Sequence, residues 1–157
     1  MITLRHSVLL LAALLATMVL GVPAAGAGSG DAQAVSATAV AFEVNLLNGS
    51  TTACRVMTSS GQVTLVHLAS FVARKTVTSC PVAVQVLTVS NASRFPNRAA
   101  YVRAGQAVVN AVSRGKVKLT GSDSTIDFYA SKTNSSLNLT LTDGHWRVSG
   151  WEGAITP

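Results

Sequence analysis

The sequence predicts an α+β domain in which helices from the first half of the chain pack on an antiparallel sheet formed by the second half. Three observations predict this class. Strict alternation of apolar and polar residues flanks Asp143-Gly144, helical periodicity extends over residues 31–47, and the chain has two cysteines, Cys54 and Cys80. The sheet is expected to have three to four strands. No obvious catalytic set of residues accompanies these signals.

The first 27 residues have the pattern of an export signal peptide. A short positive end precedes an unbroken apolar run at residues 7–22, and the small residues 25–27 offer a cleavage site. The run is short for a membrane span of about 20 residues, so an uncleaved anchor is the alternative reading. Residues 28–34 are expected to be a flexible leader. Residues 35–157 are expected to form a single domain that is secreted or lies in the cell envelope, outside the cytoplasm.

The composition argues against several classes of function. The net charge is +6, but charged residues make up only 11% of the chain. The basic residues are scattered and no basic run is interleaved with aromatic residues, so we expect a mildly basic solvated surface and no nucleic-acid partner. Neither a Gly-rich phosphate loop nor a G-x-S-x-G nucleophile elbow is present in the sequence. No cofactor and no metal site are expected.

Residues 31–47 are expected to form the first helix. Their apolar residues, among them Phe42 and Leu46, recur at helical spacing with alanines between them. Asn48-Gly49 then supplies a stop, because glycine readily adopts the left-handed conformation that ends many helices. A second, short helix that carries the first cysteine is expected to follow.

Cys54 and Cys80 are expected to form a structural disulfide. They are the only cysteines in the chain, and an exported protein meets oxidising conditions. Closing a loop of this size stabilises the folded state by about 3 kcal/mol. A redox pair or a metal site is disfavoured, because the two are far apart in sequence and no third ligand lies at a suitable spacing.

The sequence leaves helix or strand open for residues 62–90. A polar residue followed by Cys80-Pro81 is typical of a helix start. Val82, Val84 and Val86, however, alternate as in a strand, and β-branched residues favour strands. Residues 90–97 are polar, contain a proline and are expected to form a connector.

Residues 101–119 are expected to be extended. In a strand, Val108 and Val112 would face one side of the sheet, whereas Val117 would face the other side. A bulge at Gly115 would produce this change of side within a long, bent strand.

In the next predicted strand, Ile126 and Phe128 face the core and Asp127 faces the opposite way.

The final strands are expected to form a hairpin around a type I′ turn at Asp143-Gly144, because both central residues of that turn need positive φ. Side chains alternate between faces, so the turn fixes which residues face the core. The expected pairs on the core face are Leu141 with Trp146, Leu139 with Val148, and Leu137 with Gly150. Trp151 is expected opposite Ser136 on the polar face.

Three motifs resemble exported, disulfide-bearing members of the nuclear transport factor 2-like (cystatin-like) superfamily, small secreted proteins common in actinobacteria. They are F-x-x-x-L-L-x-G…A-C at residues 42–54, S-C-x-x-A at residues 79–83, and D-G-x-W-R-V at residues 143–148. The resemblance implies a curved, cone-like sheet that wraps around the helices and forms an apolar pocket. It also implies a helix at residues 80–89.

Some relatives in this superfamily are isomerases, cyclases or dehydratases with an acidic base inside the cone, and such chemistry needs a carboxylate or imidazole of tuned pKa there. His67 and Asp127 are the only acid–base candidates, and both are disfavoured: an isolated histidine in an apolar segment is typically a partly buried structural residue, and Asp127 has the outward parity. No catalytic residue is therefore assigned. The expected lining of the pocket is apolar, namely Phe42, Ile126, Phe128, Leu137, Leu139, Leu141, Trp146 and Val148.

We therefore expect an exported, non-enzymatic domain that binds a small apolar ligand or a protein partner in the cell envelope or outside the cell. One alternative is an isomerase- or hydratase-like enzyme of the same fold. Another is an immunoglobulin-like surface or adhesion domain, which four Asn-x-Ser/Thr sequons would suit. Membrane contact is expected only through an uncleaved signal segment, and a homodimer is left open.

Overall fold

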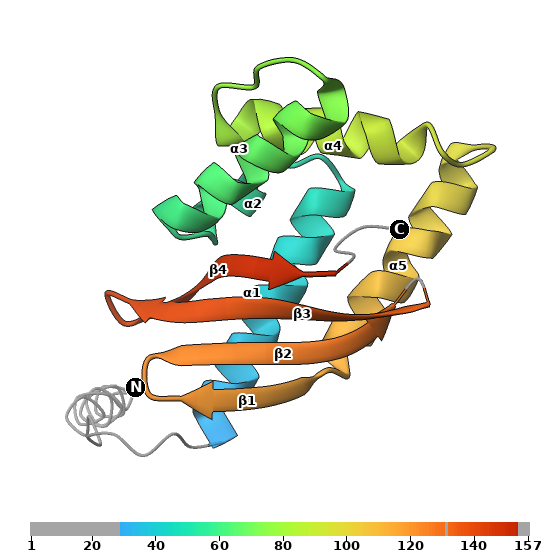
Figure 1. Ribbon diagram of the computed structural model, residues 1–157. Coiled ribbons are helices and arrows are strands. Elements are labelled where there is room, and N and C mark those ends of the chain that lie inside the picture. The colour runs from blue at the N-terminus through green and yellow to red at the C-terminus, as the bar shows by residue number, and fades with distance from the viewer. Residues whose placement is uncertain (1–28, 131, 154–157) are drawn as a thin grey trace, which may run out of the picture.

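The computed structural model describes residues 29–130 and 132–153, so the predicted signal peptide lies outside the described residues. Five helices are followed by a four-stranded antiparallel sheet in the order β1-β2-β3-β4, which does not close into a barrel (Figure 1). The elements are α1 (Ser29–Leu47), α2 (Thr52–Arg55), α3 (Ser59–Ala73), α4 (Cys80–Ala92), α5 (Arg98–Ser113), β1 (Lys116–Thr120), β2 (Asp123–Ala130), β3 (Thr133–Thr142) and β4 (His145–Glu152). The predicted α+β class is confirmed.

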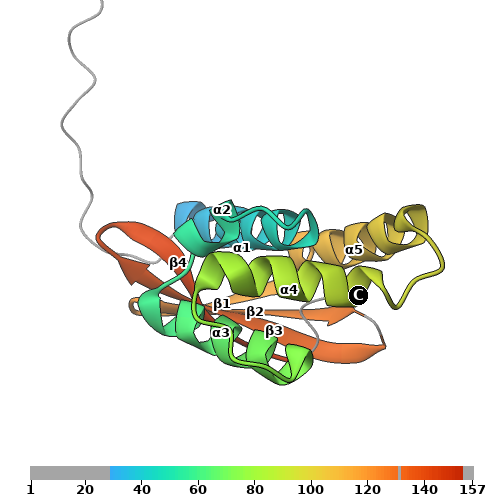
Figure 2. The ribbon, with the colours of Figure 1, turned by 90° about the horizontal axis from the view of Figure 1, so that it is seen from above.

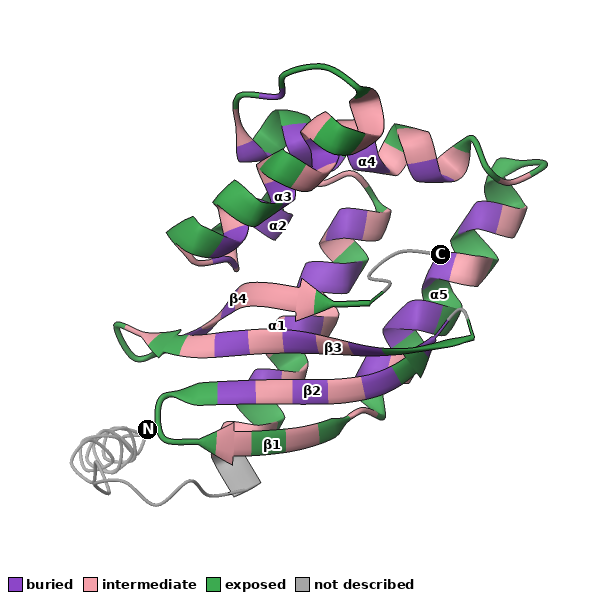
Figure 3. Cartoon of the chain, viewed as in Figure 1, coloured by how far each residue is buried: buried purple, intermediate pink, exposed green. Residues whose placement is uncertain are grey.

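The helices are arranged in two groups around the sheet (Figures 1 and 2). Helices α1 and α5 pack against each other and cover one face of the sheet. Helices α3 and α4 pack side by side at the β4 edge. The opposite face of the sheet carries alternating exposed and half-buried residues, as expected for a sheet that is covered on one side only (Figure 3).

Helix α1 forms because apolar residues recur along it at helical spacing. Val35, Ala39, Phe42 and Leu46 are all buried, as the periodicity predicts. The helix ends as expected at Gly49, which has a φ of 67°. The helix begins at Ser29, however, so most of the segment predicted as a flexible leader, residues 28–34, is helical.

The undecided middle of the chain is helical. The Thr58 side chain accepts a hydrogen bond from the Gly61 N–H at 3.1 Å and caps the start of α3. Helix α4 begins at Cys80 with a proline in its first turn, as the family resemblance implies for residues 80–89. Val84 is buried while Val82 is 44% exposed, so the alternating valines lie around a helix.

The predicted long strand over residues 101–119 is wrong, because most of it is helix α5. Tyr101, Val108 and Val112 are buried, and their spacing brings them to one face of a helix. The Asn97 side chain accepts a hydrogen bond from the Ala100 N–H at 2.9 Å and caps the start of α5. Only β1 corresponds to the extended part of the prediction.

The hairpin β3–β4 confirms the predicted turn and half of the predicted register. Asp143 and Gly144 have φ values of 52° and 75°, as a type I′ turn requires. The pairs Leu141 with Trp146 and Leu139 with Val148 form as predicted.

Beyond these pairs, the register shifts between Asn138 and Leu139, so Leu137 pairs with Trp151 and Ser136 pairs with Glu152. Trp151 consequently lies on the core side, where its ring stacks with Phe42 at a centroid distance of 6.4 Å. The prediction of Trp151 on the polar face is wrong, because one extra residue in a strand reverses the facing of every residue beyond it.

The free side of β4 is covered by the segment between α2 and α3. The Val148 N–H donates to the Val56 carbonyl at 2.8 Å, and the Thr58 N–H donates to the Val148 carbonyl at 2.9 Å. Met57 forms an isolated parallel bridge with Val148. This contact fixes the α3–α4 pair on the sheet.

Candidate functional site

The residues predicted to line an apolar pocket form the hydrophobic core instead. Seven of the eight are buried, and they pack in one cluster with helix residues such as Leu65 and Leu87. The seven are Phe42, Ile126, Phe128, Leu137, Leu139, Trp146 and Val148. Of these, only Phe128 contributes to any of the three surface depressions described below. The facing of the six strand residues among them toward the covered side of the sheet was predicted correctly, but all seven hold the layers of the domain together.

Leu141 is the exception among the predicted pocket residues, since it is 38% exposed. It lies two residues before the hairpin turn at Asp143. The hairpin end extends beyond the helices and carries exposed residues (Figure 3). Leu141 therefore faces the predicted side of the sheet, but the helices do not cover it there.

Neither predicted acid–base candidate points into the interior. The Asp127 carboxylate lies on the outer face of the sheet, where its Oδ2 is 2.5 Å from Lys118 Nζ. His67 is exposed on α3, which corrects the expectation of a partly buried histidine. The two residues lie on different elements, α3 and β2, and no described interaction connects them. Both residues, which the sequence disfavours as catalytic groups, lie on the surface.

The interior does contain one acid that the sequence analysis missed, Glu43 of α1. Its side chain is 3% exposed, and its Oε1 has no hydrogen-bond partner among the described residues. Burial without compensating partners disfavours the charged form and raises the pKa of Glu43 well above its ordinary value. One sequence signal could have identified it: Glu43 is the only charged residue between Asp31 and Arg55.

Glu43 has the properties of a tuned acid but lacks access to a substrate. A neutral carboxyl can donate a proton, and perturbed pKa values occur preferentially at functional sites. Glu43 lines none of the three surface depressions described below. Among the described residues, the only other buried side-chain nitrogen or oxygen without a hydrogen-bond partner is Trp146 Nε1. The carboxyl is therefore an isolated buried group in this conformation.

Tyr101 also has a structural role. It is 1% exposed, and its hydroxyl donates a hydrogen bond to the Leu47 carbonyl at 3.0 Å. Burial raises the pKa of Tyr101, and the nearby Arg98 charge opposes that shift. The contact satisfies one of the last carbonyls of α1 and joins it to α5.

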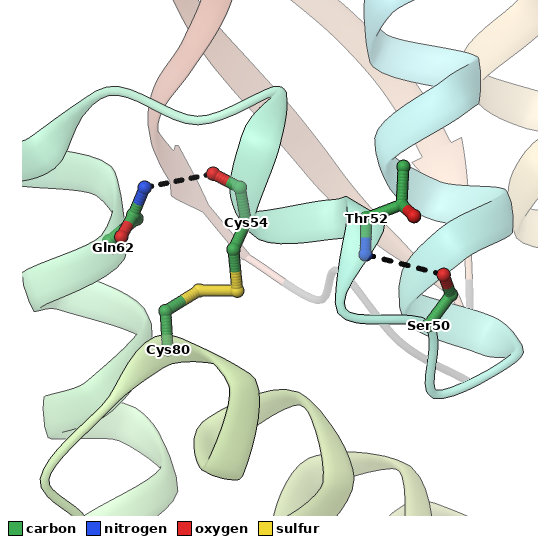
Figure 4. The surroundings of a disulfide bond; sticks show 5 residues. All are labelled: Ser50, Thr52, Cys54, Gln62 and Cys80. Atoms are coloured by element: carbon green, nitrogen blue, oxygen red, sulfur yellow. Dashed lines mark hydrogen bonds between the residues drawn. A yellow bond between two sulfur atoms is a disulfide. The ribbon is translucent and has the colours of Figure 1, made fainter.

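The predicted disulfide between Cys54 and Cys80 is present and joins α2 to the first turn of α4 (Figure 4). The Cys54 carbonyl accepts a hydrogen bond from Gln62 Nε2 at 2.8 Å, which ties α3 to the same point. A stable disulfide is typical of proteins from oxidising, extracytoplasmic compartments.

Comparisons with protein-family models, with curated proteins and with solved structures found no match. Within residues 29–130 and 132–153, no three His, Cys, Asp or Glu side chains gather closely enough to hold a metal ion. No helix in that part of the chain is long and apolar enough to cross a membrane. The candidate site therefore has to be found from the surface itself.

The two most exposed large apolar side chains of the described residues, Phe71 and Val89, lie on α3 and α4. Phe71 is 82% exposed, Val89 is 70% exposed and Val63 is 55% exposed. Exposed apolar side chains that lie next to one another can mark a contact with a partner. Residues of the two helices also line two adjoining depressions, which share Val72 and Ser90.

Basic residues line these two depressions together with the apolar side chains. Arg74 and Arg94 line one depression with Phe71, and Lys75 lines the other with Val89. We define the α3–α4 surface as Phe71, Val72, Val89, Arg74, Lys75 and Arg94.

Arg74 adopts a left-handed φ of 52° at the C-cap of α3, a position where glycine is the usual residue. Arg74 therefore adopts a backbone conformation that is unfavourable for residues other than glycine. Residues with such conformations are found preferentially at functional sites.

A third depression lies on the open face of the sheet and has a different character. Its lining includes Asp127, Tyr129, Asn134, Ser136 and Glu152, which are polar or acidic apart from the exposed tyrosine ring. It provides an internal control surface, because Tyr129 is 64% exposed and thus comparable with Phe71.

Proposed function

We propose that the chain is an exported, non-catalytic binding domain that engages its partner through the α3–α4 surface, in the cell envelope or outside the cell. The observation that carries the proposal is the exposure of Phe71 beside other apolar side chains. The absence of a predicted acid–base residue from the interior supports a binding role over catalysis. The order of helices and sheet supports the resemblance to the nuclear transport factor 2-like superfamily.

This proposal places the binding function on the outside of the helices. The residues expected to line a cone are buried against one another, so a surface partner fits the side chains better than a small ligand held inside the sheet does. The disulfide and the export-signal pattern support an extracytoplasmic location.

Oxidative footprinting of side chains tests the proposed surface. The mature domain is exposed to hydroxyl radicals alone and after mixing with an envelope fraction of the cells that produce it. We expect Phe71 to be protected in the mixture, whereas Tyr129 on the open face of the sheet keeps its reactivity. Equal protection of both rings, or protection of neither, would contradict binding through the α3–α4 surface.

A second candidate, an isomerase- or hydratase-like enzyme, is favoured by one observation, the buried and unpartnered Glu43. Catalysis requires that small molecules reach this carboxyl. Carbodiimide coupling of a small amine to the native protein measures that access, with the exposed Glu152 as the internal control. Modification of Glu43 at a rate near that of Glu152 would favour the enzyme. Modification of Glu152 alone would eliminate it.

A further inference from the structure

Charge is strongly segregated along this chain. No Asp or Glu occurs between Val44 and Ser122, the stretch that contains α2, α3, α4, α5 and β1. All six acids lie outside this stretch, and four of them belong to the last three strands or their connections. The same stretch holds nine basic residues: Arg55, Arg74, Lys75, Arg94, Arg98, Arg103, Arg114, Lys116 and Lys118.

The α3–α4 surface combines this one-sided charge with protruding apolar side chains. Phe71 is at the C-terminal end of α3, three residues before Arg74. Both line a depression with Arg94, which follows α4. The α3–α4 pair lies at the end of the molecule opposite the start of α1 (Figure 1). Cations and apolar side chains therefore share this surface, and none of the described residues that line its two depressions is acidic.

We propose that the α3–α4 surface docks on an anionic phospholipid bilayer. Phe71 and Val89 enter the boundary between headgroups and acyl chains, while the neighbouring cations contact lipid phosphates. The inference rests on the proposed function, since it names the partner of the same surface. It adds a membrane contact beyond the one expected from an uncleaved signal segment.

The shape of this surface favours a lipid bilayer over an acidic protein segment. The apolar side chains protrude, with 82% of Phe71 and 70% of Val89 exposed, whereas an anchor on a protein partner needs a pocket that encloses it. An anionic bilayer offers negatively charged phosphates and an apolar interior. The cations of this surface complement the phosphates, and its apolar side chains complement the interior.

Co-sedimentation with vesicles tests the proposal on the mature chain with its disulfide intact. Vesicles of phosphatidylcholine mixed with phosphatidylglycerol are compared with vesicles of phosphatidylcholine alone. We expect binding to the mixed vesicles and little binding to the neutral ones. Phe71→Ser is expected to weaken binding about tenfold, because an inserted aromatic ring is lost. Its matched control, Tyr129→Ser, removes an exposed ring from the open sheet face and should leave binding unchanged.

The basic residues offer a second matched pair. Arg74 and Lys132 are both exposed cations with positive φ, 52° and 66°. Arg74→Gly should weaken binding by a factor of about five, although glycine at this position should raise the melting temperature. Lys132→Gly also removes one positive charge at a residue with positive φ, but in the turn before β3. It should not change binding. A gain in stability with a loss of binding cannot result from misfolding.

Three results would overturn the proposal. The first is no binding to mixed vesicles, and the second is equal weakening by Arg74→Gly and Lys132→Gly, which indicates attraction by net charge alone. The third is binding that Phe71→Ser leaves unchanged. If the footprint at Phe71 appears with envelopes while vesicle binding is absent, the partner is a protein, and the proposed function stands without this inference. If both are absent, both fail.

Discussion

Replacing Glu43 with glutamine should change how the stability of this domain depends on pH. The buried carboxyl has a raised pKa in the folded state, and in the unfolded chain it returns to an ordinary value of 4.5. Below that value both states hold the proton, and Glu43 contributes no pH dependence. Above it the unfolded state loses the proton while the folded state keeps it, so stability falls as pH rises.

The size of the effect follows from one proton. Between the unfolded and folded pKa values of Glu43, each pH unit lowers the free energy of unfolding by about 1.4 kcal/mol. Glutamine is a neutral amide of similar shape and does not titrate. The difference in stability between Glu43→Gln and the unmodified chain should therefore be small near pH 4 and should grow with pH in favour of the variant.

Urea unfolding at several pH values between about 4 and 8 measures this difference, with the disulfide left intact. Glu152→Gln is the control, because Glu152 is exposed on the last strand and its loss should give a curve nearly parallel to that of the unmodified chain. Parallel curves for Glu43→Gln would refute the reasoning, since they would mean that the carboxyl is ionised in the folded state.

Three further substitutions test the packing. Replacing Cys54 and Cys80 by serine opens a loop with a sequence separation of 26 and should cost about 3.5 kcal/mol in urea unfolding; a loss below about 1 kcal/mol would contradict this. Gly61→Ala would place a Cβ 2.6 Å from the Val148 carbonyl oxygen and should cost about 1–3 kcal/mol, although alanine is the better helix former. Asn97→Ala removes the cap of α5 and should lower the free energy of unfolding by about 1 kcal/mol; an unchanged melting temperature would argue against the cap.

The sequence was sufficient for the parts of the fold that depend on local signals. The I′ turn and the first helix follow from residues that are close in sequence. The disulfide follows because two cysteines allow only one intramolecular pairing. Helix α5 was missed because a spacing of four residues, as between Val108 and Val112, fits both one helix face and one strand face. Buried Val109 distinguishes the two, since it has the opposite parity in a strand.

Glycine added to the ambiguity in α5. Gly105 suggests a break in a helix, but a Cβ there would collide with the side chain of Leu47. The lack of a side chain at Gly105 leaves room for Leu47 of α1, and that reason exists only in three dimensions. The bulge that turns Trp151 inward is likewise set by packing against Phe42, and not by a turn motif in the sequence.

The candidate site was the least predictable part. The sequence alone does not indicate that Phe71 is exposed, because aromatic residues are usually covered, and the position of α3 at the sheet edge leaves its outer face open. Glu43 follows the core residue Phe42, and most glutamates beside a core position reach solvent. Here α1 packs against both the sheet and α5, so even the flank of its apolar stripe is enclosed.

The way the sheet ends has a consequence for self-association. An open sheet normally offers two rows of unpaired backbone groups that can capture a strand from another molecule. In this domain the β4 side is already paired with Val56 and Thr58, and the β1 side is a five-residue strand that carries Lys116 and Lys118. A dimer of this domain is therefore expected to form through side chains of a face, because both edges of the sheet disfavour the addition of a strand.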